Sequence, residues 1–464
     1  MKYTSTRDSS LSFTFKEAVF EGLAPDGGLI IPGQIEGIDS KFLEALTDCD
    51  YYQIAFKIIR KYVDDLSDDD LEALIKKSYQ TFADSQVVPI KKFDNFFISE
   101  LFWGPTYAFK DLALQFLGNL LEYYIVKENK KINILGATSG DTGSAAIYAV
   151  KGKKNISIFI LYPYRKVSPI QELQMTAVED ENVYPIAIKG DFDDCQSIIK
   201  TLFMYKDLKY KYSLIAINSI NWARLLAQIV YYFYTYVKVT QKERIGEQVN
   251  FIVPTGNFGN IFAGFLAKKM GLPIDKLIVA TNENDILFRF VKDGIYKPEP
   301  VKETFSPSMD IAMASNFERY LYYLFGKNPE DVKAAMAGLK DRGFISFQRE
   351  QMEYVRKDFL SHKTSDKEIL KTIKDFYETH HYIVDPHTAC AINTLLYYQK
   401  ELSGPAVVFS TAHPAKFGDV IFKACNVHPE VPEGIRCLNN LKKKYILLDK
   451  DKNNVKDFLV NKAF

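Results

Sequence analysis

The sequence has few cysteines, and no two of them form a motif. Five cysteines are scattered over 464 residues, without a Cys-x-x-Cys pair and without a nearby histidine that would suggest zinc. An odd, dispersed set is typical of reduced thiols in a cytosolic protein. We therefore predict no metal site and a cytoplasmic location from Cys49, Cys195, Cys390, Cys425 and Cys437.

An excess of charge of either sign is also missing. The 59 Lys and Arg residues oppose 58 Asp and Glu residues, so no net field favours nucleic acid or an anionic membrane. No window approaches the apolar length of a membrane span, and residues 1–8 lack the apolar run of a signal peptide. We expect small metabolites as partners, and neither nucleic acid nor a membrane.

The length suits two or three domains. Residues 1–86 contain helix-like stretches and no catalytic constellation. Residues 87–436 form the main body, which an irregular, charged insertion interrupts at about residues 285–375. The polar residues 437–464 are interpreted as a solvated C-terminal tail.

The main body alternates between strand and helix patterns. Apolar runs of strand length at 156–161 and 183–188 alternate with helical spacing at 168–179 and 195–205. This alternation predicts an α/β fold with a largely parallel sheet. Continuous apolar strands indicate that helices cover both faces of the sheet.

Lys110 stands out because it lies between a Gly-Pro turn at 104–105 and an apolar helix that begins near Leu112. Phe102 and Phe109 can remove part of its hydration, which favours a nucleophilic amine that forms a Schiff base with a carbonyl. The alternative is a solvated Lys-Asp pair at the start of a helix.

Two turns between a strand pattern and a helix pattern are candidate ligand sites. Residues 256–260 place glycines where backbone N–H groups at a helix start can hold a phosphate, without the spacing of a dinucleotide motif or P-loop. Thr138, Ser139 and Thr142 offer hydroxyls that suit a substrate carboxylate. The alternatives are ordinary loop structure at 256–260 and N-capping at Asp141.

Two further polar sets lie at predicted strand ends. Asn218, Ser219 and Arg224 can converge on an anion, since a guanidinium fork with amide and hydroxyl donors suits a phosphate. The alternative is a structural cap with a surface arginine. Thr411 follows the strand pattern 406–409, on the crevice side where α/β sheets place ligands.

Long motifs give a resemblance to a known family. PTYAFKD, GATSGDTG, NSIN, PTGNFGN, DPHTA and TAHPAKF occur in that order, after GLAPDGGLIIP near the start. Together they resemble threonine synthases, pyridoxal-phosphate enzymes of fold type II (tryptophan synthase β-like). The resemblance implies a two-lobed parallel-sheet α/β fold with an extra helical N-terminal domain.

The same resemblance implies roles for individual residues. Lys110 binds the cofactor covalently and then acts as acid and base. Asp141 lies beside the ring hydroxyl, where related enzymes carry Asn, and Thr411 faces the ring nitrogen. The cofactor phosphate is held by Gly256, Asn257, Phe258, Gly259 and Asn260. The substrate carboxylate and phosphate are bound by Thr138, Ser139 and Thr142, and by Asn218, Ser219 and Arg224, respectively.

The resemblance implies conversion of O-phospho-L-homoserine and water to L-threonine and phosphate, by a monomer or dimer. Three alternatives stay open. A phospho-lyase of the same fold would give a keto acid, and a serine/threonine dehydratase would need no phosphate patch. A non-catalytic binder of a phosphorylated metabolite would not need Lys110.

Overall fold

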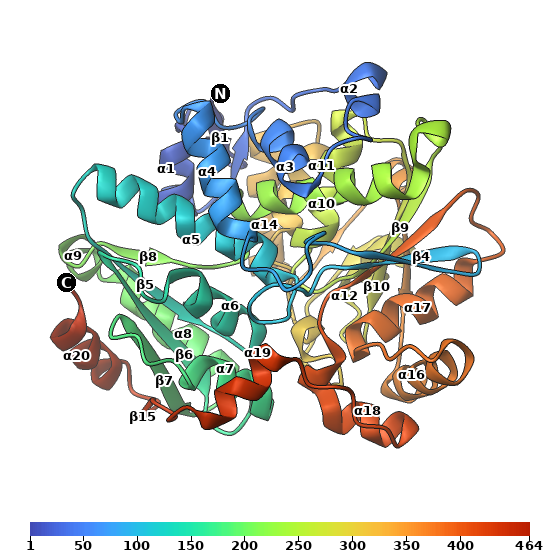
Figure 1. The fold of residues 1–464 in the computed structure, drawn as a ribbon. Coiled ribbons are helices and arrows are strands. Elements are labelled where there is room, and N and C mark those ends of the chain that lie inside the picture. The colour runs from blue at the N-terminus through green and yellow to red at the C-terminus, as the bar shows by residue number, and fades with distance from the viewer.

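The N-terminal residues form a helical layer on the rest of the chain. The computed structural model describes residues 1–464. The layer lies against the long helices of the body (Figure 1), and Asn221 in the body donates to the Val19 carbonyl over 2.7 Å. Its elements are β1 (Tyr3–Ser5), α1 (Phe15–Glu21), β2 (Ile30–Pro32), α2 (Ser40–Glu44), α3 (Tyr51–Ile59) and α4 (Asp68–Tyr79).

One lobe of the body is built on a six-stranded sheet in the order β13-β10-β9-β14-β4-β3. All neighbours pair in parallel except the hairpin of β3 with β4. The strands are β3 (Ile90–Phe93), β4 (Phe96–Glu100), β9 (Val249–Pro254), β10 (Ile274–Thr281), β13 (Phe359–Lys363) and β14 (Ala406–Ser410).

The other lobe carries a five-stranded, fully parallel sheet in the order β15-β7-β6-β5-β8. Every residue of β6 is buried, as a strand covered on both faces requires. Its strands are β5 (Ile132–Ala137), β6 (Ile156–Pro163), β7 (Val183–Lys189), β8 (Leu214–Ala216) and β15 (Ile446–Asp449). The predicted α/β fold with two parallel-sheet lobes is confirmed.

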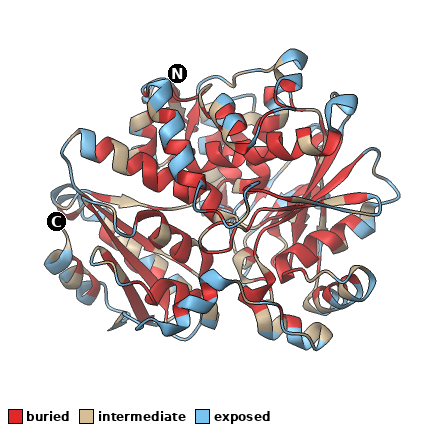
Figure 2. Cartoon of the chain, in the orientation of Figure 1, coloured by how far each residue is buried: buried red, intermediate tan, exposed pale blue.

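The helices of the body pack around these sheets. In α10 every residue except Lys238 is buried, because the N-terminal layer covers the face that the lobes leave free (Figure 2). The helices are α5 (Lys110–Lys127), α6 (Asp141–Val150), α7 (Pro169–Thr176), α8 (Phe192–Met204), α9 (Lys206–Lys211), α10 (Trp222–Thr240), α11 (Gly259–Met270), α16 (Asp366–His380), α17 (Pro386–Tyr398), α18 (Gly418–Cys425) and α19 (Glu433–Arg436).

The segment expected as an insertion is part of the sheet framework. Its strand β13 pairs in parallel with β10, at the edge of the six-stranded sheet. The strand was not predicted because it has only five residues and lies between charged stretches, so no strand pattern stands out in the sequence. The other elements are α12 (Ile286–Asp293), β11 (Ile295–Tyr296), η2 (Pro307–Met309), α13 (Phe317–Leu324), α14 (Pro329–Arg342), β12 (Ile345–Ser346) and α15 (Arg349–Asp358).

The C-terminal residues correct the expectation of a solvated tail over 437–464. Strand β15 pairs in parallel with β7, and α20 (Lys452–Lys462) buries Val455 and Leu459 against the same lobe. The two apolar side chains lie four positions apart, on one face of the helix. No helix of the structure is both long and apolar enough to span a membrane.

Candidate functional site

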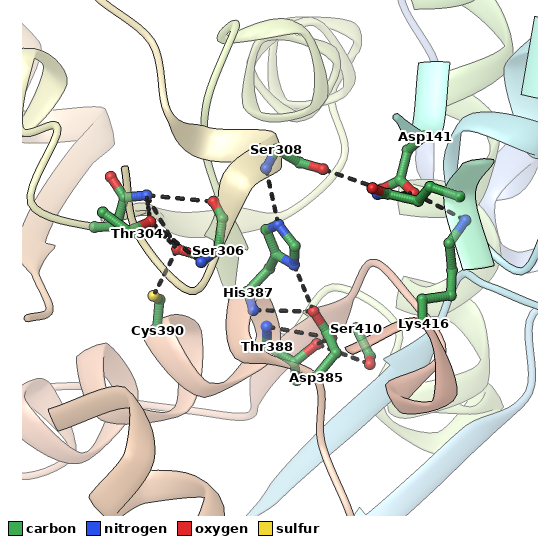
Figure 3. Close-up of polar contacts among 12 residues, drawn as sticks. Asp141, Thr304, Ser306, Ser308, Asp385, His387, Thr388, Cys390, Ser410 and Lys416 are labelled. Atoms are coloured by element: carbon green, nitrogen blue, oxygen red, sulfur yellow. Dashed lines mark hydrogen bonds and ion pairs between the residues drawn. The ribbon is translucent and has the colours of Figure 1, made fainter. Parts of the chain in front are cut away.

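Four polar side chains from distant segments meet between the two lobes. Lys110 begins α5, Asp141 begins α6, Ser308 lies in η2, and Lys416 lies in η3 (Pro414–Phe417). Asp141 Oδ2 is 3.4 Å from Lys110 Nζ and accepts from Ser308 Oγ over 3.0 Å, while its Oδ1 is 2.8 Å from Lys416 Nζ. Figure 3 shows Ser308 and Lys416 on opposite sides of the Asp141 carboxylate.

The loop before Lys110 is locked by buried hydrogen bonds. Asp111 accepts from the backbone N–H and the hydroxyl of Thr106, over 2.8 and 2.7 Å. The N–H of Phe109 donates to the Thr411 carbonyl over 2.9 Å, so the loop is attached to the end of β14. Asp111 therefore serves the loop, and the alternative of a solvated Lys-Asp pair is wrong.

The Lys110 amine lies in a partly desolvated, electrostatically balanced position. Its side chain is 12% exposed. Burial lowers its pKa, the Asp141 carboxylate acts in the opposite direction, and the cations Lys416 and Arg224 lower the pKa further. A lysine in this setting can supply a neutral amine more readily than one in water.

Asp141 is held as an anion. Burial opposes its ionisation, yet Lys416 and Lys110 hold the pKa of its carboxyl well below the usual range. Gln171 donates a hydrogen bond to Asp141 Oδ1 over 2.9 Å. The N-cap residue of α6 is Gly140, so Asp141 does not cap the helix. An ionised carboxylate accepts hydrogen bonds and cannot donate them, so any donor in this cluster belongs to a neighbouring residue.

The turn at 256–260 has the geometry of an anion cradle. No side chain caps the first turn of α11, and Phe258 adopts a left-handed conformation with φ 62°. Gly256 faces the Ser308 carbonyl so closely that an added Cβ would lie 2.8 Å away. The Asn260 Oδ1 atom accepts from Tyr231 inside the core over 2.6 Å, whereas its Nδ2 atom is buried and has no hydrogen-bond partner in the protein, so the amide side chain keeps an unused donor.

The hydroxyls in the turn before α6 differ in whether they are hydrogen-bonded within the protein. Thr138 Oγ1 accepts from the N–H groups of Gly140 and Gly143, over 2.9 and 2.8 Å, and so shapes the loop. Ser139 and Thr142 are half-buried, and their hydroxyls make no hydrogen bond within the protein. These two are free for a ligand, whereas Thr138 holds the loop that presents them.

Arg224 is a buried cation without an anionic partner. It is 3% exposed, and its Nε and Nη1 atoms have no hydrogen-bond partner in the protein, as is true of Asn218 Oδ1. Burial lowers the pKa of Arg224 to about 10. The alternative of a surface arginine is wrong, and Asn221 caps α10 instead. A buried, unpaired guanidinium is costly unless a ligand anion completes it.

Two other predicted residues, Ser219 and Thr411, differ in their contacts. Ser219 Oγ is 2.7 Å from Ser315 Oγ, and the buried Thr411 side chain makes no hydrogen bond within the protein. Ser308, Lys416 and Gln171 were not predicted as site residues. Lys416 is fully buried, and only its opposite charge to Asp141 is a sequence signal for it.

No group of three or more His, Cys, Asp or Glu side chains is arranged to hold a metal ion. Two surface cavities, of about 520 and 600 Å³, lie away from the Lys110 cluster. The first lies against β13, and the second lies near Tyr323 and Tyr354.

These features fit pyridoxal phosphate. A lysine with a lowered pKa suits its aldehyde, and the uncapped turn at 256–260 suits its phosphate. The pyridoxal-phosphate dependent enzyme family model matches residues 85–411. Fold and site therefore define a pyridoxal-phosphate-dependent enzyme.

Family models that match the two ends of the chain specify a narrower family of enzymes. The models for the threonine synthase N terminus and the threonine synthase C-terminal region match residues 2–79 and 388–459. Threonine synthase of Saccharomyces cerevisiae is 45% identical, over 97% of this chain and 95% of its own length. The chain belongs to the threonine synthase family, and its cofactor is pyridoxal phosphate.

Solved structures agree over the whole chain. Threonine synthase from Brucella melitensis with bound pyridoxal phosphate has a TM-score of 0.95 and 39% identity, covering 100% of this chain and 99% of that one. The yeast threonine synthase structure has a TM-score of 0.94 and 43% identity, covering 99% and 98%. The predicted fold type and the N-terminal domain are confirmed.

Proposed function

We propose that this enzyme converts O-phospho-L-homoserine and water to L-threonine and phosphate. The observation that carries the proposal is the buried Arg224 guanidinium, which has two unpaired nitrogens and lies near enough to Lys110 to lower its pKa. The turn at 256–260 suits the cofactor phosphate, so Arg224 is available for a second phosphate on the substrate.

The residues then have separate tasks. Bound pyridoxal phosphate supplies an electron sink that acidifies C–H bonds near the substrate amino group. Lys110 Nζ holds the cofactor before substrate arrives, and then moves protons at the α and β carbons. Arg224, with Asn218 and Ser219, binds the phosphate that leaves the γ carbon, and water adds at the β carbon.

The loop before α6 positions the other end of the substrate. Ser139 and Thr142 have free hydroxyls next to the start of α6, where Thr138 already accepts from the Gly143 N–H and the helix dipole favours a carboxylate. Thr411 faces the cofactor ring nitrogen, and Asp141 lies beside the ring hydroxyl. Because Asp141 is ionised, it accepts a hydrogen bond there rather than donating one.

The proposal includes a cellular location and an oligomeric state. We place the enzyme in the cytoplasm, acting on a small metabolite in threonine biosynthesis, as a monomer or a dimer. Neither nucleic acid nor a membrane is part of this proposal, because the net charge is only +1 at pH 7.

The test is to incubate the purified holoenzyme with O-phospho-L-homoserine and to measure free phosphate and threonine together. Equal release of both is the expected result. Phosphate with a keto acid and no threonine would identify the phospho-lyase instead. Absence of both products, with the cofactor bound, would refute this substrate and leave the dehydratase and the non-catalytic binder as candidates.

A further inference from the structure

Ser308 is a site residue whose position is set from outside the site. It lies in η2, within the segment between β10 and β13, and 167 positions along the chain from Asp141. Its hydroxyl donates to Asp141 Oδ2 over 3.0 Å and lies 3.4 Å from Lys110 Nζ. One hydroxyl therefore contacts both the amine that reacts with the cofactor and its counter-ion.

The backbone of Ser308 is held by a buried histidine. Its N–H donates to His387 Nε2 over 3.1 Å, and His387 Nδ1 lies 2.7 Å from Asp385 Oδ1. His387 and Asp385 are 2% and 0% exposed. Because Nε2 accepts a hydrogen bond, its proton must reside on Nδ1, and the Asp385 carboxylate fixes that tautomer.

The chain of contacts continues to β14. The Thr388 hydroxyl donates to Asp385 Oδ2 and lies 2.9 Å from Ser410 Oγ. Ser410 immediately precedes Thr411, which is predicted to face the cofactor ring nitrogen. Figure 3 shows this series running from Ser410 through Asp385 and His387 to Ser308 and Asp141.

A second cluster fixes the turn from its other side. Asp310 accepts from the Thr304 hydroxyl and from Asn282 Nδ2, each over 2.7 Å. Ser306 joins the same cluster through Asn282 Nδ2 over 3.0 Å and makes no contact with Lys110 or Asp141. Hydrogen bonds therefore hold the turn on two sides, and the Ser308 hydroxyl points to the site.

We propose that Ser308 is a positioning residue that aims Lys110 and Asp141 at the cofactor, and that His387 and Asp385 act through it. The inference rests on the proposed role of Lys110 in binding the cofactor. In this proposal the Asp385–His387 pair, with its tautomer fixed, connects the end of β14 to the Lys110 amine through Ser308. A neutral Oγ can donate to the carboxylate and accept from the amine at the same time.

The first test follows capture of pyridoxal phosphate by the cofactor-free protein, through the absorbance change as Lys110 adds to the aldehyde and water leaves. Ser308→Ala is expected to slow capture roughly tenfold, since it loses a hydrogen bond to charged groups. Ser306→Ala, the matched control, removes a buried hydroxyl from the same turn and should capture at the wild-type rate. Equal rates for wild type and Ser308→Ala would overturn the proposal.

The role of His387 is tested with two variants, one that keeps a hydrogen-bond acceptor for the Ser308 N–H and one that removes it. His387→Gln keeps an acceptor for the Ser308 N–H and should capture within about threefold of wild type, whereas His387→Leu should match the roughly tenfold loss of Ser308→Ala. The double variant should be no slower than the slower single variant, because His387 acts only by placing the Ser308 hydroxyl, which Ser308→Ala already removes. Effects that multiply would show that His387 acts independently of Ser308.

A second measurement holds even if the His387 variants fold poorly. Nitrogen NMR of the histidines in the wild-type protein is expected to show His387 protonated on Nδ1 and bare on Nε2, and a proton on Nε2 would overturn the relay. None of these tests uses the substrate. Failure of the proposed reaction would instead appear as missing threonine from wild-type holoenzyme that captures the cofactor normally.

Discussion

Two buried arginines show the difference between a completed and an incomplete polar cluster. Arg319 donates to the carbonyl oxygens of Ile30 and Ile220 and to Asn316 Oδ1, at distances from 2.6 to 3.1 Å. Arg224, which is 3% exposed, leaves Nε and Nη1 without partners. Burial lowers the pKa of both, to about 9 for Arg319 and about 10 for Arg224.

The two surroundings explain this difference. Arg319 lies where the N-terminal layer joins the body, and the neighbouring Glu318 carboxylate binds Arg7 and Thr6. That seam satisfies its own donors, as a structural contact must. Arg224 lies close enough to Lys110 to lower the pKa of its amine, and its Nε and Nη1 donors have no partner in the protein. We therefore propose that the unpaired buried charge of Arg224 belongs to the ligand site.

The largest expected effect separates chemistry from stability. Lys110→Ala should lower kcat by roughly 1000-fold or more, because it removes both the cofactor anchor and the proton carrier. Its free energy of unfolding should change little, since the helix start keeps its backbone and alanine favours helix. Steady-state kinetics and urea unfolding measure the two effects. Near-wild-type kcat in Lys110→Ala would contradict the catalytic role of Lys110.

Arg319→Met should break the completed cluster. The change leaves the Ile30 and Ile220 carbonyls and Asn316 without their donor, and we expect a loss of about 3–5 kcal/mol in the free energy of unfolding. Chemical denaturation gives this value. An unchanged midpoint would contradict the claim that Arg319 holds the N-terminal layer on the body.

Arg224→Met should give the opposite pattern. The free energy of unfolding should stay equal or rise by about 1 kcal/mol, because an unpaired buried charge is replaced by an apolar side chain. At the same time kcat/KM for O-phospho-L-homoserine should fall roughly 100-fold. Parallel losses of stability and activity would show that Arg224 is structural, like Arg319.

The smallest expected effect is on pH dependence. Cofactor capture requires a neutral Lys110 amine, and burial lowers the pKa of that amine. The capture rate should therefore rise with pH and reach half its maximum below the pKa of an ordinary lysine. Asp141→Asn removes the anion that favours the charged amine, so the midpoint should move to still lower pH. A midpoint that moves upward would contradict the Asp141–Lys110 contact.

Local patterns predicted candidate site positions along the chain. The turn at 256–260 and the hydroxyl-rich turn before α6 each follow a strand pattern and open a helix, whereas Lys110 was singled out because it lies between a Gly-Pro turn and a helix. The α/β alternation and buried strands such as β6 were also predictable from local patterns. Arg224 was recognisable as a donor, but its lack of a partner is visible only in the fold.

The residues that were missed depend on contacts between distant segments. Ser308 lies in a charged stretch without regular periodicity, and its importance comes from Asp141 and His387, which are 167 and 79 positions away. Lys416 lies in the TAHPAKF motif, but its ion pair with Asp141 joins segments 275 positions apart and is visible only in the fold. Strand β15 was missed because only four residues, alternately half-buried and exposed, pair at the sheet edge.

The proposed role of Arg224 is tested most directly by the thermal stability of the holoenzyme in inorganic phosphate. The cofactor already fills the turn at 256–260, so added phosphate should bind at Arg224 and raise the Tm of the wild type with increasing concentration. Arg224→Met holoenzyme should show no such rise. Equal increases in Tm for the two proteins would contradict the claim that Arg224 is kept unpaired to bind the phosphate of the substrate.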